Sequence, residues 1–199
     1  ALPPEVTEKD WVGQNRKDLR QHKLVTIDGR TAKDFDDAIY VEKSDRGFTL
    51  WVAIADVSHY VRPGPNIDAE AYERGPSTYF PNFVAPMLPE KLSNELCSLK
   101  PKVPRLALVA EMDLDFQGVL VQSRFYEAVI QSHARVTYGE AQEIIDGNTP
   151  ADKRHVEAEI SRAGDLAQTL MQKRFQDGSL ALEIPDTAIK CENIGNPAG

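Results

Sequence analysis

The chain has 199 residues, of which 41% are hydrophobic and 27% are charged, and its formal net charge is −8 at pH 7. This composition is typical of an ordinary globular domain, or of part of a larger one. No apolar run is long enough to cross a bilayer and no signal peptide is evident, so we expect a cytoplasmic protein without a membrane partner. Cys97 and Cys191 are far apart and lack CxxC spacing, which indicates reduced thiols rather than a zinc site or a disulfide framework.

The acidic excess, taken alone, argues against a nucleic-acid partner, because phosphate binding usually requires a basic surface. Basic residues are nevertheless grouped at two places, although such groups are more often solvated faces than phosphate contacts. The groups are Arg16, Lys17, Arg20, His22 and Lys23, followed later by Lys100, Lys102 and Arg105. Charge therefore leaves nucleic-acid binding open.

The first half of the chain predicts a lead-in followed by strands. Residues 1–20 are polar with few apolar anchors, and are predicted to form a linker or an extended lead-in. Strands are predicted over 24–27, 38–41 and 48–55. The run LWVAIA at 50–55 lacks polar alternation, so we expect that strand to be covered on both faces.

A short helix is predicted over 68–74, because a Gly-Pro pair follows it directly. Residues 79–89 (YFPNFVAPMLP) include three prolines, which exclude a helix or a central strand there. Their aromatic and apolar side chains indicate an ordered loop. A second pair of strands is predicted over 106–112 and 119–129.

The remaining elements are two helices and a strand. A Thr-x-x-Glu capping box predicts a helix over 137–145, and apolar residues at alternating four- and three-residue spacing predict a long amphipathic helix over 156–178. Alternation predicts a strand over 180–184, and nothing convincing follows. The predicted fold class is α+β, with a mostly antiparallel sheet and packed helices.

Four aspartates lie within ten residues between the first two predicted strands. They are Asp28, Asp34, Asp36 and Asp37, in the sequence IDGRTAKDFDDA. Ionised carboxylates this close repel one another unless they are splayed in solvent, protonated or neutralised by divalent cations such as Mg²⁺, which prefers hard oxygen ligands. In extended chain Asp34 and Asp36 point the same way and Asp37 points elsewhere. On the residues alone, a magnesium site and a solvated acidic loop both stay open; a calcium loop is disfavoured because the D-x-D-x-D-G pattern is absent.

Longer blocks of the sequence carry a family resemblance. They are LVTIDGRTAKDFDDAIYVEK, LWVAIADVSHYVRPG, RGPSTYFPNFVAPMLPEKLSNELCSL and FYEAVIQSHARVTY. In this order they resemble the catalytic domain of the ribonuclease II/ribonuclease R family, and the aspartate block is more like ribonuclease R. The resemblance is specific over 18–138, looser over 139–184 and absent after Pro185. It implies that 21–185 form the N-terminal half of that catalytic domain, with 1–20 as a lead-in and 186–199 as an irregular tail.

The resemblance implies a processive, Mg²⁺-dependent (or Mn²⁺-dependent) hydrolytic exoribonuclease. Such an enzyme degrades single-stranded RNA from its 3′ end and releases nucleoside 5′-monophosphates. By the same resemblance all four aspartates are catalytic: Asp28, Asp34 and Asp37 hold the metal, and Asp36 is required for cleavage but not for binding. Tyr79 matches the family tyrosine that packs against the last nucleotides; without the resemblance it is simply a core aromatic.

Other candidates have more ordinary interpretations. His59 and His133 are expected to be structural, because two-metal hydrolysis needs no histidine. Asp56 follows a strand, where it either supports the site or caps a turn. Arg105 and Arg135 are expected to form surface or ion-pair contacts rather than phosphate contacts.

Two parts of the family's full-length proteins are missing from the sequence. They are the small β-barrel RNA-binding domains, and the second half of the catalytic domain with its arginine and its wall of the RNA channel. We therefore expect these parts as partners in cis or in trans. Two hypotheses stay open: a nuclease completed by those parts, and a truncated module that binds metal or a partner without cleaving.

Overall fold

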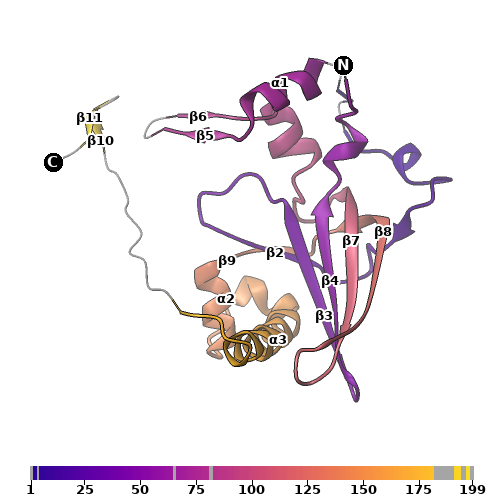
Figure 1. The fold of residues 1–199 in the computed structure, drawn as a ribbon, viewed down its shortest axis with the longest axis vertical. Coiled ribbons are helices and arrows are strands. Elements are labelled where there is room, and N and C mark those ends of the chain that lie inside the picture. Colours follow the sequence, from indigo (N-terminus) through magenta and orange to yellow (C-terminus); the bar gives the residue numbers. More distant parts are fainter. Residues whose placement is uncertain are drawn as a thin grey trace.

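The computed structural model describes residues 2–3, 5–64, 66–80, 83–181, 191–193 and 196–197. Within these residues, seven strands form one sheet in the order β1-β8-β7-β4-β3-β2-β9 (Figure 1). Their bounds are β1 Lys17–Asp18, β2 Val25–Asp28, β3 Asp37–Ser44, β4 Gly47–Ala55, β7 Pro104–Leu114, β8 Leu120–Gln131 and β9 Ala134–Thr137. The neighbours from β8 to β2 are antiparallel, whereas β1 pairs with β8 and β9 pairs with β2 in parallel. The predicted α+β class with a mostly antiparallel sheet is confirmed.

Helices and two short strand pairs make up the other described elements. The helical elements are η1 Glu8–Asp10, η2 Val57–His59, α1 Asn66–Arg74, the π-helix η3 Lys91–Leu96, α2 Tyr138–Ile145, η4 Ala151–Val156 and α3 Glu157–Gln176. The small strand pairs are β5 Thr78–Tyr79 with β6 Val84–Ala85, and β10 Cys191–Asn193 with β11 Asn196–Pro197. In Figure 1 α2 and α3 lie together beside β2 and β3, whereas α1 and the β5–β6 hairpin gather beyond the opposite end of the strands. None of the described helices is long and apolar enough to span a membrane.

The two faces of the sheet are covered by different parts of the chain. On one face, Leu166 of α3 packs against Val41 and Phe48. On the other face, the fully buried Leu92 and Leu99 pack against the inner residues of β4 and β7. Full burial of a leucine side chain stabilises a fold by about 1.5–3 kcal/mol, so the segment around η3 is firmly attached to the sheet.

The prediction that β4 is covered on both faces holds at its centre and is wrong at its end. Trp51 and Ala53 are buried on one face, and Leu50 packs against α3 on the other. Ile54 is 45% exposed, because α3 does not extend this far and a pocket opens beside it.

The N-terminal segment, expected as a linker or extended lead-in, lies against the sheet. Trp11 and Leu19 are its apolar anchors; Trp11 packs with Leu106 and Val129, and β1 adds a strand beside β8. Arg16 forms a buried ion pair with Asp56 at the end of β4. This segment is therefore part of the packed structure.

The predicted helices and strands recur with shifts of a few residues at their ends. The capping box at Thr137 is present, with its hydroxyl accepting a hydrogen bond from the Glu140 amide at 3.3 Å. The η3 helix and the β5–β6 hairpin were not predicted; the hairpin lies within the expected loop. The strand predicted over 180–184 falls mostly outside the described residues. In the tail expected to be irregular, the described residues form the β10–β11 ladder.

Candidate active site

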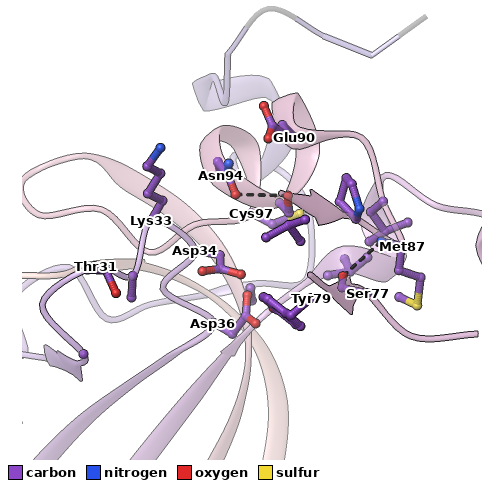
Figure 2. Close-up of a pocket in the computed structure, with 18 of the residues that line it drawn as sticks. Thr31, Lys33, Asp34, Asp36, Ser77, Tyr79, Met87, Glu90, Asn94 and Cys97 are labelled. Carbon is purple, nitrogen blue, oxygen red and sulfur yellow. Dashed lines mark hydrogen bonds between the residues drawn. The ribbon is translucent and has the colours of Figure 1, made fainter. Parts of the chain in front are cut away.

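The four aspartates are distributed over two strands and the loop that joins them. Asp28 ends β2, Asp37 begins β3, and Asp34 and Asp36 lie in the intervening loop. Asp34 and Asp36 line a pocket of about 830 Å³, and Tyr79 of β5 lines the same pocket. Figure 2 shows the side chains of Asp34, Asp36 and Tyr79 in its central part. The fold thus brings three of the five predicted site residues into one pocket, and Asp28 and Asp37 are not among its lining residues.

Phe35 sets the direction of the two loop aspartates. Its side chain is buried, its amide donates a hydrogen bond to the Ser98 hydroxyl at 3.0 Å, and its carbonyl accepts one from the Leu99 amide at 2.8 Å. Because side chains alternate along extended chain, a Phe35 fixed inward leaves Asp34 and Asp36 facing the pocket. The prediction that these two point the same way is therefore confirmed.

Asp36 and Asp37 are positioned by the β3–β4 pairing. The Ala55 amide donates to the Asp36 carbonyl at 2.8 Å, and Asp37 pairs in register with Ile54. Asp36 lines the pocket, whereas Asp37 is not among its lining residues.

Burial and the charges of neighbouring aspartates raise the pKa of two of the carboxylates, Asp28 and Asp36. Burial raises the pKa of Asp36, and the neighbouring charges of Asp34 and Asp37 raise it further. Burial also raises the pKa of Asp28, with a further contribution from Asp37. One oxygen of Asp28, Oδ2, is buried without a hydrogen-bond partner, which is costly for a carboxylate. The four groups therefore form one electrostatically coupled set.

The four aspartates supply the hard oxygen ligands that a divalent cation such as Mg²⁺ prefers. All four candidates are carboxylates, and the unpartnered oxygen of Asp28 is the kind of group that a cation would satisfy. Within the described ranges, however, no three or more His, Cys, Asp or Glu side chains converge as a ready metal-binding group. The charges of Asp34 and Asp37 are thus close enough to raise the pKa of Asp28, but the three carboxylates do not converge on a single cation position.

The raised pKa of Asp36 leads to a prediction for the metal-free protein. A carboxyl whose pKa is raised in the folded state stabilises the fold below its unfolded pKa of about 4, and this contribution is lost as the pH rises through the folded pKa. Asp36→Asn removes the charge, so we expect the variant to unfold about 1–2 °C higher than wild type at pH 7 in EDTA, a small rise because solvent screens the site. The two proteins should converge near pH 4.

Thermal unfolding followed by circular dichroism at several pH values measures this difference. Asp45→Asn, in the exposed turn between β3 and β4, is the matched control. A lower midpoint for Asp36→Asn at pH 7 would show that repulsion at Asp36 is not a cost to the fold.

The wall of the pocket opposite the aspartates comes from the β5–β6 hairpin and the segment up to η3. Tyr79 is 72% exposed, so its ring is accessible from the pocket. The Met87 amide donates to the Ser77 hydroxyl at 3.0 Å (Figure 2). Arg74 of α1 donates to the Pro86 carbonyl at 2.9 Å, which ties the hairpin to α1.

Most residues of the pocket lining were not predicted from the sequence. The lining residues beyond the predicted ones include Ile54, Val84, Pro86, Met87, Leu88, Glu90, Ser93, Asn94 and Cys97. For Val84, Pro86, Met87 and Leu88 the signal was the density of prolines and apolar residues in the stretch from Tyr79 to Pro89; the other five lie outside that stretch. Burial raises the pKa of Cys97 to about 12, with a further contribution from Asp36, so this thiol stays protonated and is a poor nucleophile.

Two of the remaining candidates have structural roles. Asp56 accepts hydrogen bonds from Ser58 Oγ at 2.6 Å and from the His59 amide at 3.1 Å, and it pairs with Arg16. It therefore caps the turn of η2 and anchors the N-terminal segment. His133 contacts the Gln131 carbonyl through Nδ1 at 3.1 Å, which supports the structural role predicted for it.

The two arginine candidates bind backbone carbonyls. Arg105 donates through Nε to the Ser98 carbonyl at 2.9 Å. Arg135 donates through Nη2 to the carbonyls of Gly29 at 2.7 Å and Arg30 at 2.9 Å. The expected surface or ion-pair roles are wrong for both, because Arg105 binds the backbone of the segment that supports the aspartate loop and Arg135 binds the backbone of the loop itself.

The basic residues near the N-terminus are also engaged within the chain. Arg20 pairs with Asp18 at 2.6 Å, and Lys23 donates to the His155 carbonyl at 3.2 Å. Lys17 lies 3.7 Å from the centre of the Tyr126 ring. With Arg16 bound to Asp56, this group does not form an open phosphate-binding track.

Comparisons with known proteins agree with the fold. The RNB domain family matches residues 16–198. Ribonuclease R of Vibrio parahaemolyticus is 47% identical over 189 residues, which cover 94% of this chain and 22% of that protein. The structure of Mycoplasma genitalium RNase R in complex with double-stranded RNA has a TM-score of 0.90 at 34% identity, covering 97% of this chain and 34% of that one. The chain thus spans less than a quarter of the length of its curated Vibrio relative.

A more distant structure shares the fold alone. The yeast protein Ssd1, described as a pseudonuclease, has a TM-score of 0.70 at 18% identity and covers 86% of this chain and 20% of that one. Since the same fold occurs in a protein described in this way, the fold by itself does not establish cleavage.

Proposed function

This chain belongs to the RNB domain family, and we propose that it is the N-terminal half, residues 21–185, of the catalytic domain of a 3′-to-5′ exoribonuclease. The proposed reaction is hydrolysis of single-stranded RNA to nucleoside 5′-monophosphates. The observation that carries this proposal is the pocket that Asp34, Asp36 and Tyr79 line together. The two aspartates come from the β2–β3 loop and Tyr79 comes from β5. Aspartates that share a divalent cation with a phosphate, beside an aromatic ring for the base, suit a nucleotide.

The pocket has the size and lining that a nucleotide needs. Its volume of about 830 Å³ lies within the range of about 300–1,000 Å³ typical of small-molecule sites. On one side it presents Asp34 and Asp36, and on the other it presents Tyr79 with the apolar Val84 and Met87. Stacking of an unpaired base on an exposed tyrosine is tolerant of sequence, which suits an enzyme that degrades any RNA.

Asp28, Asp34 and Asp37 are the residues that would hold Mg²⁺, with Mn²⁺ as an alternative. When bound, divalent cations would activate the attacking water and neutralise charge on the leaving oxygen. Asp28 and Asp37 are held by β2 and β3, whereas Asp34 projects from the loop into the pocket. Asp36 lies in the pocket beside Asp34 and is not one of the proposed metal ligands.

Binding of an RNA strand requires parts beyond this chain. The net charge is −8, and Arg16, Arg20 and Lys23 are engaged in internal contacts. We therefore propose that the phosphate-binding surface comes from the second half of the catalytic domain and from RNA-binding barrel domains, in cis or in trans. The cytoplasmic location expected from the sequence stays a prediction.

A second candidate function is a module that binds metal or a partner and does not cleave RNA. The described carboxylates do not converge as a ready metal-binding group, and a protein described as a pseudonuclease has the same fold. Metal dependence of RNA hydrolysis separates the two candidates.

The experiment is digestion of single-stranded RNA by the chain continued with the rest of an RNB domain. With Mg²⁺ or Mn²⁺ we expect nucleoside 5′-monophosphates, identified by chromatography, and with EDTA we expect turnover to fall at least a hundredfold because two charge-stabilising cations are lost. A heat-inactivated sample controls for chemical hydrolysis. Release of 3′-phosphorylated products, or equal turnover in EDTA, would contradict the proposed reaction.

A further inference from the structure

One arginine contacts the aspartate loop near both of its ends. Arg135 of β9 donates through Nη2 to the carbonyls of Gly29 and Arg30, at 2.7 and 2.9 Å, directly after Asp28. Its guanidinium carbon also lies 5.5 Å from the centre of the Phe35 ring, between Asp34 and Asp36 in the sequence. A single side chain therefore connects the start of the loop with the residue that orients its aspartates.

The strand pairing explains why Arg135 reaches both places. β9 runs parallel to β2, and Arg135 pairs in register with Thr26, two residues before Asp28. At the next turn of the chain, the Gly29 carbonyl accepts a hydrogen bond from the Ala32 amide at 3.1 Å in addition to the one from Arg135. The turn that leads from β2 toward Asp34 is thus held by backbone and side chain together.

Phe35 is held from its other side by the segment after η3. Ser98 accepts from the Phe35 amide and donates to the Lys33 carbonyl at 3.2 Å. Ser98 is itself buried, and its carbonyl accepts from Arg105. The loop is therefore enclosed between Ser98, which binds Lys33 and Phe35, and Arg135, which binds the turn next to Asp28.

We propose that Arg135 is the positioning residue of the aspartate site, holding the turn at Gly29–Arg30 and the Phe35 ring so that Asp28 and Asp34 stay within reach of one cation. This inference rests on the proposed metal site. It assigns a role in that site to a residue that forms no hydrogen bond or ion pair with any of the four aspartates. Neighbours of this kind, which hold metal ligands in place, typically change metal affinity by about 10–100-fold when they are lost.

The sign of the effect separates positioning from electrostatics. Arg135 is a positive charge near a cation site, so its removal would tighten cation binding if charge were its only contribution. If it holds the loop, its removal weakens binding despite the loss of that repulsion. Arg135→Lys keeps the charge but replaces a planar guanidinium, which reaches two carbonyls and a ring, with a single ammonium group.

The test uses the 199-residue chain and two measurements. Isothermal titration with Mn²⁺ is expected to show affinity about tenfold lower for both Arg135→Met and Arg135→Lys. Amide hydrogen exchange is expected to be faster at Ala32 and Phe35 in both variants, since these amides lie in the turn and loop that Arg135 holds. Arg124→Met is the matched control, because Arg124 pairs with Glu111 and Asp113 of β7.

Each outcome decides the proposal. Unchanged or tighter Mn²⁺ binding in Arg135→Met, with circular dichroism showing an intact fold, would overturn it. Should Arg135→Met fail to fold, Arg135→Lys supplies the same comparison. If wild type binds no Mn²⁺, the proposed metal site is wrong, but hydrogen exchange still tests the role of Arg135 in holding the loop. Faster exchange at Ala32 and Phe35 in the variants supports that role, and unchanged exchange refutes it.

Discussion

Asp36→Asn is expected to reduce RNA cleavage at least a hundredfold while leaving RNA binding nearly unchanged, in a protein that contains this chain and the rest of an RNB domain. Asp36 lies in the pocket with Asp34 and Tyr79, and it is not one of the proposed metal ligands. Loss of a single well-placed group that acts on the reacting atoms commonly costs a factor of about 100–1,000. Removal of one negative charge beside the phosphates favours binding slightly.

Single-turnover cleavage and equilibrium binding of the same labelled RNA measure the two effects separately. Asp45→Asn, which removes a carboxylate from the β3–β4 turn, should retain wild-type values in both assays. Unfolding does not account for the expected loss, because Asp36→Asn is predicted to be at least as stable as wild type without metal. Near-normal turnover in Asp36→Asn would show that the catalytic assignment is misplaced.

The isolated 199-residue chain is expected to be a poor exonuclease, at least a hundredfold slower than the same chain completed by the rest of the domain. Processive cleavage requires several nucleotides to be held while the terminal phosphate is aligned, and small misplacements cost on the order of a hundredfold in rate. In the described residues no three carboxylates converge, so the site is not preassembled. The net charge of −8 also repels RNA at low salt.

A 5′-labelled single-stranded RNA incubated with the chain and Mg²⁺ provides the measurement, with Asp36→Asn beside it. We expect no ladder of shortened products from the chain alone, and a ladder after the missing half of the domain is added. A clean ladder from the chain alone, absent in Asp36→Asn, would make it a self-sufficient enzyme. No cleavage even after completion would favour the non-cleaving module.

The sequence by itself determined the elements whose signals are local. Strand-type residues on either side of a polar turn located β3 and β4, the Thr137 capping box located the start of α2, and the spacing of apolar residues located α3. It also determined that Asp34 and Asp36 share a side, because alternation along extended chain depends only on sequence separation. The aspartate cluster and Tyr79 were identified as one site through family resemblance, and the pocket brings Asp34, Asp36 and Tyr79 together.

Only the tertiary structure decided what surrounds and holds those aspartates. Ser98 and Arg135 are distant from the loop in sequence, and they reach it because η3 packs on one face of the sheet and β9 pairs in parallel with β2. Sequence alone predicted a surface or ion-pair role for Arg135, since a lone arginine gives no sign that two backbone carbonyls will lie within its reach. The exposure of Ile54 was also not predicted, because it depends on a distant element: α3 packs against Leu50 of β4 but does not reach Ile54. Long-range contacts of this kind depend on which elements meet in space, and neither periodicity nor local composition contains that information.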